Sequence, residues 1–398
     1  MKLPRNLLSA VFLSRLLILV TVLIGSSIIL NHNIPSVSGS NPKIGVPVLN
    51  GLVRWDSIYY FNITLNGLSW YRSATIQSTN IECWAFRPFF PMIVASLRWP
   101  IASIGDYESC LIAAFCWNII AFLLAAVFFY KLTEILYDAK VASLATLFLC
   151  ISPAAVFFVA PYPESTYLLL ITASFFFVEK EKTKLSTSLS FLAGFTRPEG
   201  ILTSILMGLK GLAKRGKKGI MLLVCAVFLV LPLPIYMLFS YVMTSNFYMP
   251  IYKEQIWPKT PFVYLFFDII HGGHTYLPNF GLIPFLTLTL PFVTLAIVTL
   301  CLAGYFIHFS RKNLPKVDLH LKEKQTPYFI YMLLVVAFFL YASDFNSFTR
   351  YVSLLLPMYW MTSLWAGKSR VRTFFLASIY IILMIIGTLL YINWYSFI

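Results

Sequence analysis

Five acidic residues stand where a charge is costly, at the ends of long apolar segments or inside aromatic sequence. They are Asp56, Glu164, Glu199, Asp268 and Asp344. Ionisable groups in such places usually mark a cavity, an ion path or a reaction site. A carboxylate there can accept a proton or hold a cation, so these residues are the first candidates for chemistry.

Asp56 belongs to segment 54–57 (RWDS), where aromatic residues surround the carboxylate. Partial dehydration strengthens a carboxylate as a base, which suits Asp56 to accept the proton of a sugar hydroxyl. The alternative is that Asp56 caps a helix that begins at Ser57. The sequence leaves both roles open.

Glu164 and Glu199 each follow a proline in a tight turn, in segments 161–165 (PYPES) and 196–200 (TRPEG). A glutamate at the start of a helix can simply complement the helix dipole. The second turn also carries Arg197. Two acidic proline turns on one side of a membrane indicate a shared site.

Asp344 and Arg350 share segment 343–351 (SDFNSFTRY). An unpaired guanidinium at membrane depth costs several kcal/mol, so Arg350 either pairs with Asp344 or faces a phosphate. Pro357 predicts a kink in the span that follows.

Metal and disulfide signals are weak. Asp268, His271 and His274 have a spacing that can bind a metal, but two glycines separate the histidines, and we predict no metal site. Six cysteines are scattered without a ligand spacing. Cys83 and Cys110 can pair only if their side of the membrane is oxidising.

The elements that position these residues are membrane-spanning helices. Of the 398 residues, 59% are hydrophobic and 11% are charged, and the mean hydropathy is +0.79. This composition rules out a soluble enzyme. We therefore predict an all-α polytopic membrane protein, a single domain over residues 1–398 with about eleven transmembrane helices of roughly 20 residues. The predicted spans are residues 7–30, 109–130, 142–160, 164–178, 185–196, 199–212, 220–243, 281–309, 328–343, 349–366 and 373–392.

The charges give the topology. The formal charge is +15, but the basic residues form short clusters between apolar segments rather than a continuous stripe, which argues against nucleic acid as a partner. If every predicted segment crosses, most of the 30 Lys and Arg residues lie on one face, which is predicted to be cytoplasmic and to hold the N-terminus. Glu179 and Glu181 lie among these lysines, as expected of solvated ion pairs.

The two longest connections, residues 31–108 and 244–280, then lie on the opposite face. The five acidic residues named above lie on the same face. The first connection is rich in Trp, Tyr and Phe from Trp55 onward, which predicts short helices along the outer membrane interface. The chain shows no internal repeat, in contrast to many transporters built from inverted halves.

Four motifs carry a resemblance to a known family. Segments 55–61 (WDSIYYF), 85–91 (AFRPFFP), 152–165 (SP followed by APYPES) and 196–200 (TRPEG) resemble, in this order, those of the PIG-V family. That family comprises the GPI mannosyltransferase 2 enzymes and their prokaryotic relatives, within the GT-C superfamily of multi-spanning glycosyltransferases. The chain departs from the family pattern at Tyr59 and Tyr60, where eukaryotic members tend to carry a His, and at residues 198–200, where Ser-Asn-Gly is more usual.

The resemblance implies a GT-C-like helix bundle and an enzyme that moves a sugar, typically mannose. The donor would be a dolichyl or polyprenyl phosphate sugar, and the acceptor a hydroxyl of a glycolipid or glycan on the non-cytoplasmic side. In that superfamily an acidic residue early in the first outer loop is the catalytic base, and Asp56 holds the matching position. The implied location is the endoplasmic reticulum membrane, with GPI-anchor biosynthesis, in a eukaryote, and the plasma membrane in an archaeon or bacterium.

This chemistry assigns roles to the other candidates. Breaking the sugar–phosphate bond leaves an anionic lipid phosphate, which Arg350 and Arg197 are expected to surround. Asp56 takes the acceptor proton in a single displacement with inversion, and Glu164 and Glu199 orient Arg197 or the sugar hydroxyls. The predicted substrate-binding residues are Trp55, Glu164, Arg197, Glu199, Asp344, Arg350 and Tyr351. No cofactor is predicted, because no Gly-rich phosphate cradle occurs.

Two other classes of protein compete with this interpretation. A transporter or lipid flippase with an acidic outer cavity is the first, although it would need charges near mid-membrane. The second is a structural subunit of a glycosylation complex without chemistry of its own. Beyond the substrates and membrane lipids, a small membrane subunit is a further candidate partner.

Overall fold

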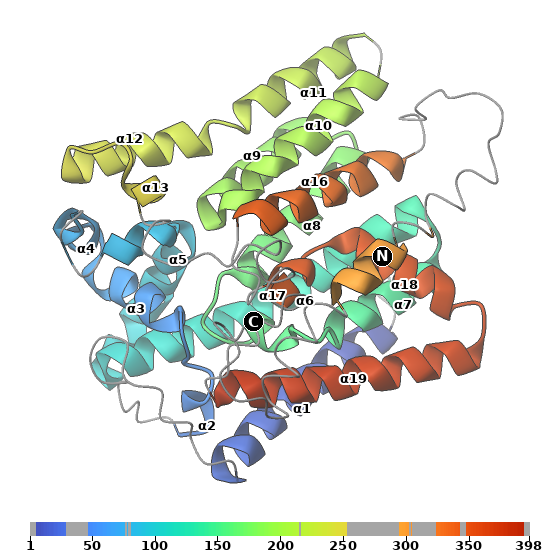
Figure 1. The fold of residues 1–398 in the computed structure, drawn as a ribbon, viewed down its shortest axis with the longest axis horizontal. Coiled ribbons are helices and arrows are strands. Elements are labelled where there is room, and N and C mark those ends of the chain that lie inside the picture. The colour runs from blue at the N-terminus through green and yellow to red at the C-terminus, as the bar shows by residue number, and fades with distance from the viewer. Residues whose placement is uncertain are drawn as a thin grey trace, which may run out of the picture.

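The computed structural model describes residues 5–28, 47–75, 78, 81–214, 216–252, 294–301, 304, 324–342 and 348–393. Within these ranges every regular element is a helix (Figure 1). The α-helices are α1 (Arg5–Ile28), α2 (Pro47–Asn50), α3 (Ser57–Asn66), α4 (Leu68–Ser73), α5 (Phe89–Arg98), α6 (Asp106–Leu136), α7 (Ala139–Cys150), α8 (Glu164–Glu179), α9 (Thr183–Thr196), α10 (Thr203–Ala213), α11 (Lys217–Phe228), α12 (Pro232–Thr244), α13 (Met249–Tyr252), α16 (Thr326–Ala342), α17 (Phe348–Val352), α18 (Leu356–Ala366) and α19 (Arg370–Ile392). The 3-10 helices are η1 (Ile81–Ala85), η2 (Trp99–Ile104), η3 (Ala155–Phe158) and η4 (Pro198–Leu202).

Four helical segments of the described chain are long and apolar enough to cross a membrane: Leu7–Ser26, Asp106–Leu136, Lys217–Thr244 and Arg370–Ile392. Shorter apolar helices cover Phe89–Ile104, Ala139–Cys150 and Thr326–Phe339. The prediction of an all-α membrane protein is therefore confirmed. The number of about eleven spans stays a prediction, in part because most of the predicted span 281–309 lies outside the described residues.

The helices pack around α6 and α8, which pack against each other. α7 packs against α6 and α18, α9 against α8, and α11 against α10. Helices α1 and α19 lie side by side although they come from opposite ends of the chain (Figure 1). This arrangement gathers the starts of α3 and α8, the turn after α9 and the short helix α17 at one place.

The described part of the first long connection folds as predicted into short helices, α2 to α5 with η1 and η2. The aromatic side chains of this region, together with Tyr236 of α12, form a separate buried cluster. Its largest members are Tyr60, Phe61, Tyr71, Trp84, Phe86, Phe90 and Tyr236. Cys83 and Cys110 are both buried in this cluster as free thiols, so no disulfide joins them. The position of these helices at the membrane interface stays a prediction.

The predicted span 142–160 is wrong as a continuous helix. Helix α7 has only 12 residues and ends at Cys150, because Pro153 has no backbone N–H to extend the ladder. The carbonyl groups freed at this break receive the guanidinium of Arg15, which is buried in α1. Arg15 donates hydrogen bonds to the carbonyl oxygens of Cys150 at 2.7 Å and Ala155 at 3.4 Å, and lies 4.1 Å from the centre of the Phe122 ring.

A second correction concerns Pro357. The chain breaks at residues 353–355, between α17 and α18, and Pro357 stands in the first turn of α18. Proline is tolerated there because the first-turn N–H groups have no intrahelical partner. Pro357 therefore helps to start a helix rather than kinking one, and Arg350 lies on a separate short helix.

The charges at the far end of α8 also differ from expectation. Glu181 is exposed and pairs with Lys214 at 3.1 Å and Lys218 at 2.6 Å, as predicted for a solvated cluster. Glu179, by contrast, is largely buried, where it binds Lys210 and accepts a hydrogen bond from the Tyr328 hydroxyl at 2.7 Å. Contacts from α10 and α16 cover Glu179, which the local sequence did not reveal.

Candidate active site

Asp56 immediately precedes α3, but its side chain does not cap that helix. Its backbone is helical (φ −60°, ψ −20°), and the carboxylate makes no capping hydrogen bond. Instead Oδ2 accepts a hydrogen bond from Nη1 of Arg350 at 2.8 Å. The N-cap alternative is therefore wrong for the side chain, which leaves the carboxylate directed at a cation.

The backbone at Asp56 is held in an unusual shape. Trp55 has φ +50°, a left-handed conformation that costs a non-glycine residue roughly 1–2 kcal/mol. The Tyr162 hydroxyl spans this point: it donates to the carbonyl of Arg54 at 2.9 Å and accepts from the N–H of Asp56 at 3.1 Å. Asn118 in turn donates to the carbonyl of Tyr162 at 3.0 Å. These contacts fix the direction in which Asp56 leaves the chain.

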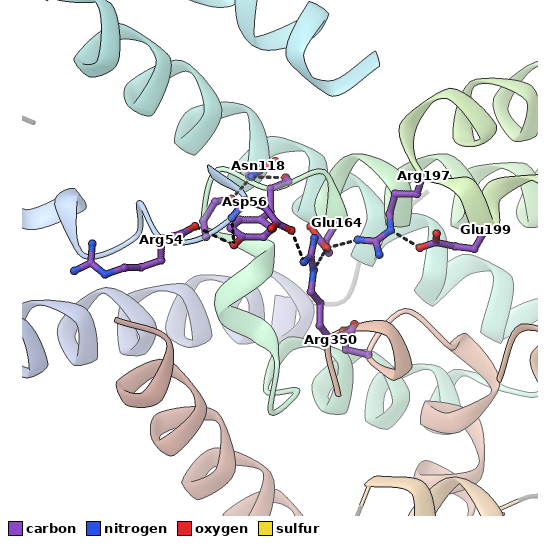
Figure 2. A network of polar contacts seen from close by, with 10 residues as sticks. Arg54, Asp56, Asn118, Glu164, Arg197, Glu199 and Arg350 are labelled. Carbon is purple, nitrogen blue, oxygen red and sulfur yellow. Dashed lines mark hydrogen bonds and ion pairs between the residues drawn. The ribbon is translucent and has the colours of Figure 1, made fainter. Parts of the chain in front are cut away.

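Arg54 serves as an anchor and not as part of the site. Its guanidinium extends away from Asp56 (Figure 2) and donates to the carbonyl oxygens of Asn50, Val53 and Ile392, each at 2.8 Å. Ile392 is the last residue of α19, so Arg54 ties the segment before α3 to the end of the final helix.

Five charged side chains form one continuous chain of ion pairs (Figure 2). Arg350 on α17 donates to Asp56 and, through Nε, to Oε1 of Glu164 at the start of α8. The same Oε1 accepts from Nη1 of Arg197, whose Nε donates to Glu199 in η4. We call Asp56, Arg350, Glu164, Arg197 and Glu199 the ion-pair chain. It contains three carboxylates and two guanidinium groups.

Exposure changes along this chain. The Glu164 side chain is 0% exposed, whereas the Asp56 side chain is 28% exposed, and the other three are buried. Charges this deep persist only when they are paired, because an unpaired buried charge costs several kcal/mol. Asp56 is thus the member through which a substrate can reach the chain.

Aromatic rings line both arginines. The Arg350 guanidinium lies 4.6 Å from the centre of the Tyr162 ring and 5.1 Å from that of Phe157. Arg197 lies 5.1 Å from the ring of Tyr351, which itself stacks on Phe339 at 4.5 Å. Such contacts favour the charged form of a guanidinium at little desolvation cost. Tyr351, predicted to bind substrate, forms a wall beside the arginines.

Two residues outside the predicted set also belong to the surroundings. Tyr60 on α3 is buried, and this burial, followed by the charge of Glu164, holds its pKa well above the usual value. Arg87, from the AFRPFFP motif, is buried with its guanidinium 4.0 Å from the centre of the Tyr236 ring, and burial lowers its pKa while Tyr236, Tyr71 and Glu199 oppose that effect. Its place in a motif was the only available signal.

The structure thus brings together six of the eight predicted site residues, while Trp55 lies beside them in the backbone and Asp344 lies outside the described residues. Arg350 pairs with Asp56 and Glu164, which are 294 and 186 residues away in sequence. Both partners differ from Asp344, the partner that the local sequence offers. Asp268, His271 and His274 also fall outside the described part of the chain.

Comparison with known proteins points to one family. The chain is 29% identical to GPI alpha-1,6-mannosyltransferase 2 of Mus musculus over 171 residues, which cover 42% of this chain and 33% of the mouse protein. It is 28% identical to GPI mannosyltransferase 2 of Drosophila melanogaster over 168 residues, 39% of this chain and 35% of the fly protein. The chain thus spans about a third of the length of these relatives.

A solved structure shares the fold. The oligosaccharyltransferase of Archaeoglobus fulgidus in its apo form matches 98% of this chain and 56% of its own, with a TM-score of 0.52 and 11% sequence identity. At this identity the likeness concerns the fold alone.

A family model described as "Mannosyltransferase (PIG-V)" matches residues 7–397, nearly the whole chain. This match includes every residue of the ion-pair chain and the four motifs from which the resemblance was drawn. The protein therefore belongs to the PIG-V mannosyltransferase family.

Proposed function

We propose that the protein is an inverting membrane mannosyltransferase that takes mannose from dolichyl or polyprenyl phosphate and attaches it to a hydroxyl of a lipid-linked glycan. Family membership supports the reaction class. The observation that carries the proposal is the pairing of Asp56, a partly exposed carboxylate, with Arg350 on its buried side. A base and a phosphate-binding cation are the two groups that this reaction requires, and here they are in contact.

The reaction follows from these two groups. The acceptor oxygen attacks the anomeric carbon while the bond from that carbon to the phosphate oxygen breaks, and the bonding electrons leave with the lipid phosphate. Asp56 removes the proton of the attacking hydroxyl. Arg350 stabilises the charge that develops on the phosphate.

Arg197 lies between Glu164 and Glu199, both of which are largely or fully buried, whereas one partner of Arg350 is the partly exposed Asp56. We assign Glu164, Arg197 and Glu199 to holding Arg350 in place, with Trp55 and Tyr351 as walls of the sugar site. This division refines the expectation that both arginines face the phosphate.

The site is proposed to face the non-cytoplasmic side. The ion-pair chain gathers at the start of α8, and the Lys214–Glu181–Lys218 cluster lies just beyond its end. With 16 residues, α8 separates them by roughly 24 Å. Basic clusters favour the cytoplasmic side. The membrane is then that of the endoplasmic reticulum in a eukaryote, or the plasma membrane in an archaeon or bacterium, and a small membrane subunit stays a prediction.

The test is to supply the purified chain with radiolabelled dolichyl-phosphate mannose and candidate glycolipid acceptors. Label moving onto an acceptor lipid supports the proposal. If the purified chain consumes no donor, it is a structural subunit without chemistry of its own. Movement of labelled lipid between leaflets of a vesicle without transfer would indicate a flippase.

A further inference from the structure

Resting on this proposed function, we infer that Asp56 and the donor phosphate compete for the same arginine, so that binding of the donor releases the base. Asp56 and Glu164 hold Arg350 unequally, and this difference sets the order of events at the arginine.

Asp56 is held by one contact. Among the described residues, only Arg350 binds its carboxylate, and the helix that follows receives no capping hydrogen bond from it. The contact lies at the exposed end of the ion-pair chain, where a phosphate can approach. A phosphate offers more acceptor oxygens and more negative charge than a carboxylate, so it is the stronger ligand for a guanidinium.

Glu164 is bound differently. Its Oε1 accepts from both Arg350 and Arg197, and the side chain is fully buried. Its other oxygen, Oε2, is also buried and has no hydrogen-bond partner among the described residues. Glu164 therefore keeps Arg350 in place when the contact with Asp56 is lost. This makes Glu164 a positioning residue.

The exchange has a chemical consequence. While Arg350 Nη1 donates to Oδ2 of Asp56, that oxygen is occupied by the guanidinium. Once the phosphate takes Nη1 of Arg350, Oδ2 is free to accept the proton of the acceptor hydroxyl. The base therefore becomes accessible to the acceptor only when the sugar to be transferred is present.

If Asp56 and the phosphate compete for Arg350, removing Asp56 should tighten phosphate binding; a purely structural ion pair would not have this effect. Asp56→Asn, which removes the competitor, should bind tritiated dolichyl phosphate about fivefold or more tightly than the wild-type chain, since the fraction of Arg350 free to bind rises. Binding is measured on the full chain in detergent by scintillation proximity. Asp56→Ala is the second variant, should the asparagine form be poorly folded.

The Arg350→Gln background controls for the loss of negative charge at position 56. In that background Asp56→Asn removes the same charge, but Arg350 is absent and cannot be released, so the affinity for dolichyl phosphate should change less than about twofold. Tightening that persists without Arg350 would mean simple electrostatic repulsion and would overturn the inference. So would unchanged or weaker binding by Asp56→Asn when the wild-type chain binds the lipid.

Failure of the proposed function looks different. In that case the wild-type chain binds no dolichyl phosphate and transfers no mannose, whatever stands at position 56. The competition is overturned on its own only if the wild-type chain binds and transfers.

Discussion

Arg350 and Arg197 are chemically identical, yet their surroundings give them different tasks. Arg197 has two glutamate partners that are 0% and 4% exposed, whereas Arg350 shares one of these and takes Asp56 as its second. Since Asp56 is the accessible acid, only the contact between Arg350 and Asp56 can be exchanged without opening the buried part of the site. The two glutamates and Arg197 supply rigidity.

Asp56→Asn should lower mannose transfer by about two to four orders of magnitude, the range that a general base supplies. Because the Asp56 side chain is 28% exposed, we expect the variant to stay folded in detergent. Transfer from labelled donor and the thermal unfolding midpoint are measured on the same preparation. Transfer close to the wild-type rate would exclude Asp56 as the base.

At the scale of elements, the turn between α9 and α10 depends on one glycine. A Cβ at Gly200 would lie 2.3 Å from the carbonyl carbon and oxygen of Ala193, which are backbone atoms and cannot move aside. This close approach folds η4 back on the end of α9 and so places Arg197 beside Glu199. The geometry of the site therefore requires glycine at position 200.

Gly200→Ala should therefore lower both the unfolding midpoint and mannose transfer, because the turn must shift by an amount that costs about 1–3 kcal/mol. The matched control is Gly208→Ala on α10, where the new methyl group would meet only Ala226 at 3.8 Å. Equal behaviour of the two variants would show that the close approach is not required. Both quantities are measured in detergent.

The break after α7 depends on a residue from another helix. Arg15→Met keeps the length of the side chain but removes the donors that reach the carbonyl oxygens of Cys150 and Ala155. Leaving such buried groups unsatisfied costs about 1–3 kcal/mol each, so the unfolding midpoint should fall. Arg72→Met on the exposed side of α4 is the control. A midpoint as high as that of the control would contradict the capping role.

At the scale of the whole molecule, the site joins distant parts of the chain. Asp56 and Arg350 lie 294 residues apart, and Arg54 ties the first connection to the end of α19 across 338 residues. The site therefore forms only when the chain is folded from end to end. Its orientation in the membrane is likewise set by the whole molecule.

The topology predicts that α4 and the start of α9 lie on opposite sides of the membrane. Ser69→Cys and Lys184→Cys place thiols at exposed positions on these helices. In sealed vesicles of known sidedness, an impermeant maleimide should label the first from the non-cytoplasmic side and the second from the cytoplasmic side only. Labelling is compared with the wild-type chain, whose own cysteines give the background. The reverse pattern would place the ion-pair chain on the cytoplasmic side of the membrane and would contradict the proposed reaction on the non-cytoplasmic side.

The sequence by itself determined the membrane class, the helical content and the charged residues of the candidate site. These follow from local physics: apolar stretches enter a bilayer, and a charge beside them is costly wherever the rest of the chain lies. Asp56, Glu164, Arg197, Glu199 and Arg350 were recognisable for that reason.

Only the tertiary structure decided which acid meets which arginine. The partners of Arg350 come from α8 and from the segment before α3, and no local pattern encodes a contact across such separations. The same holds for Tyr162, whose hydroxyl bonds to the peptide groups on either side of Trp55, and for Arg15, which caps the end of α7. Pairing is set by the packing of helices, because burial of the charges leaves each of them few possible partners.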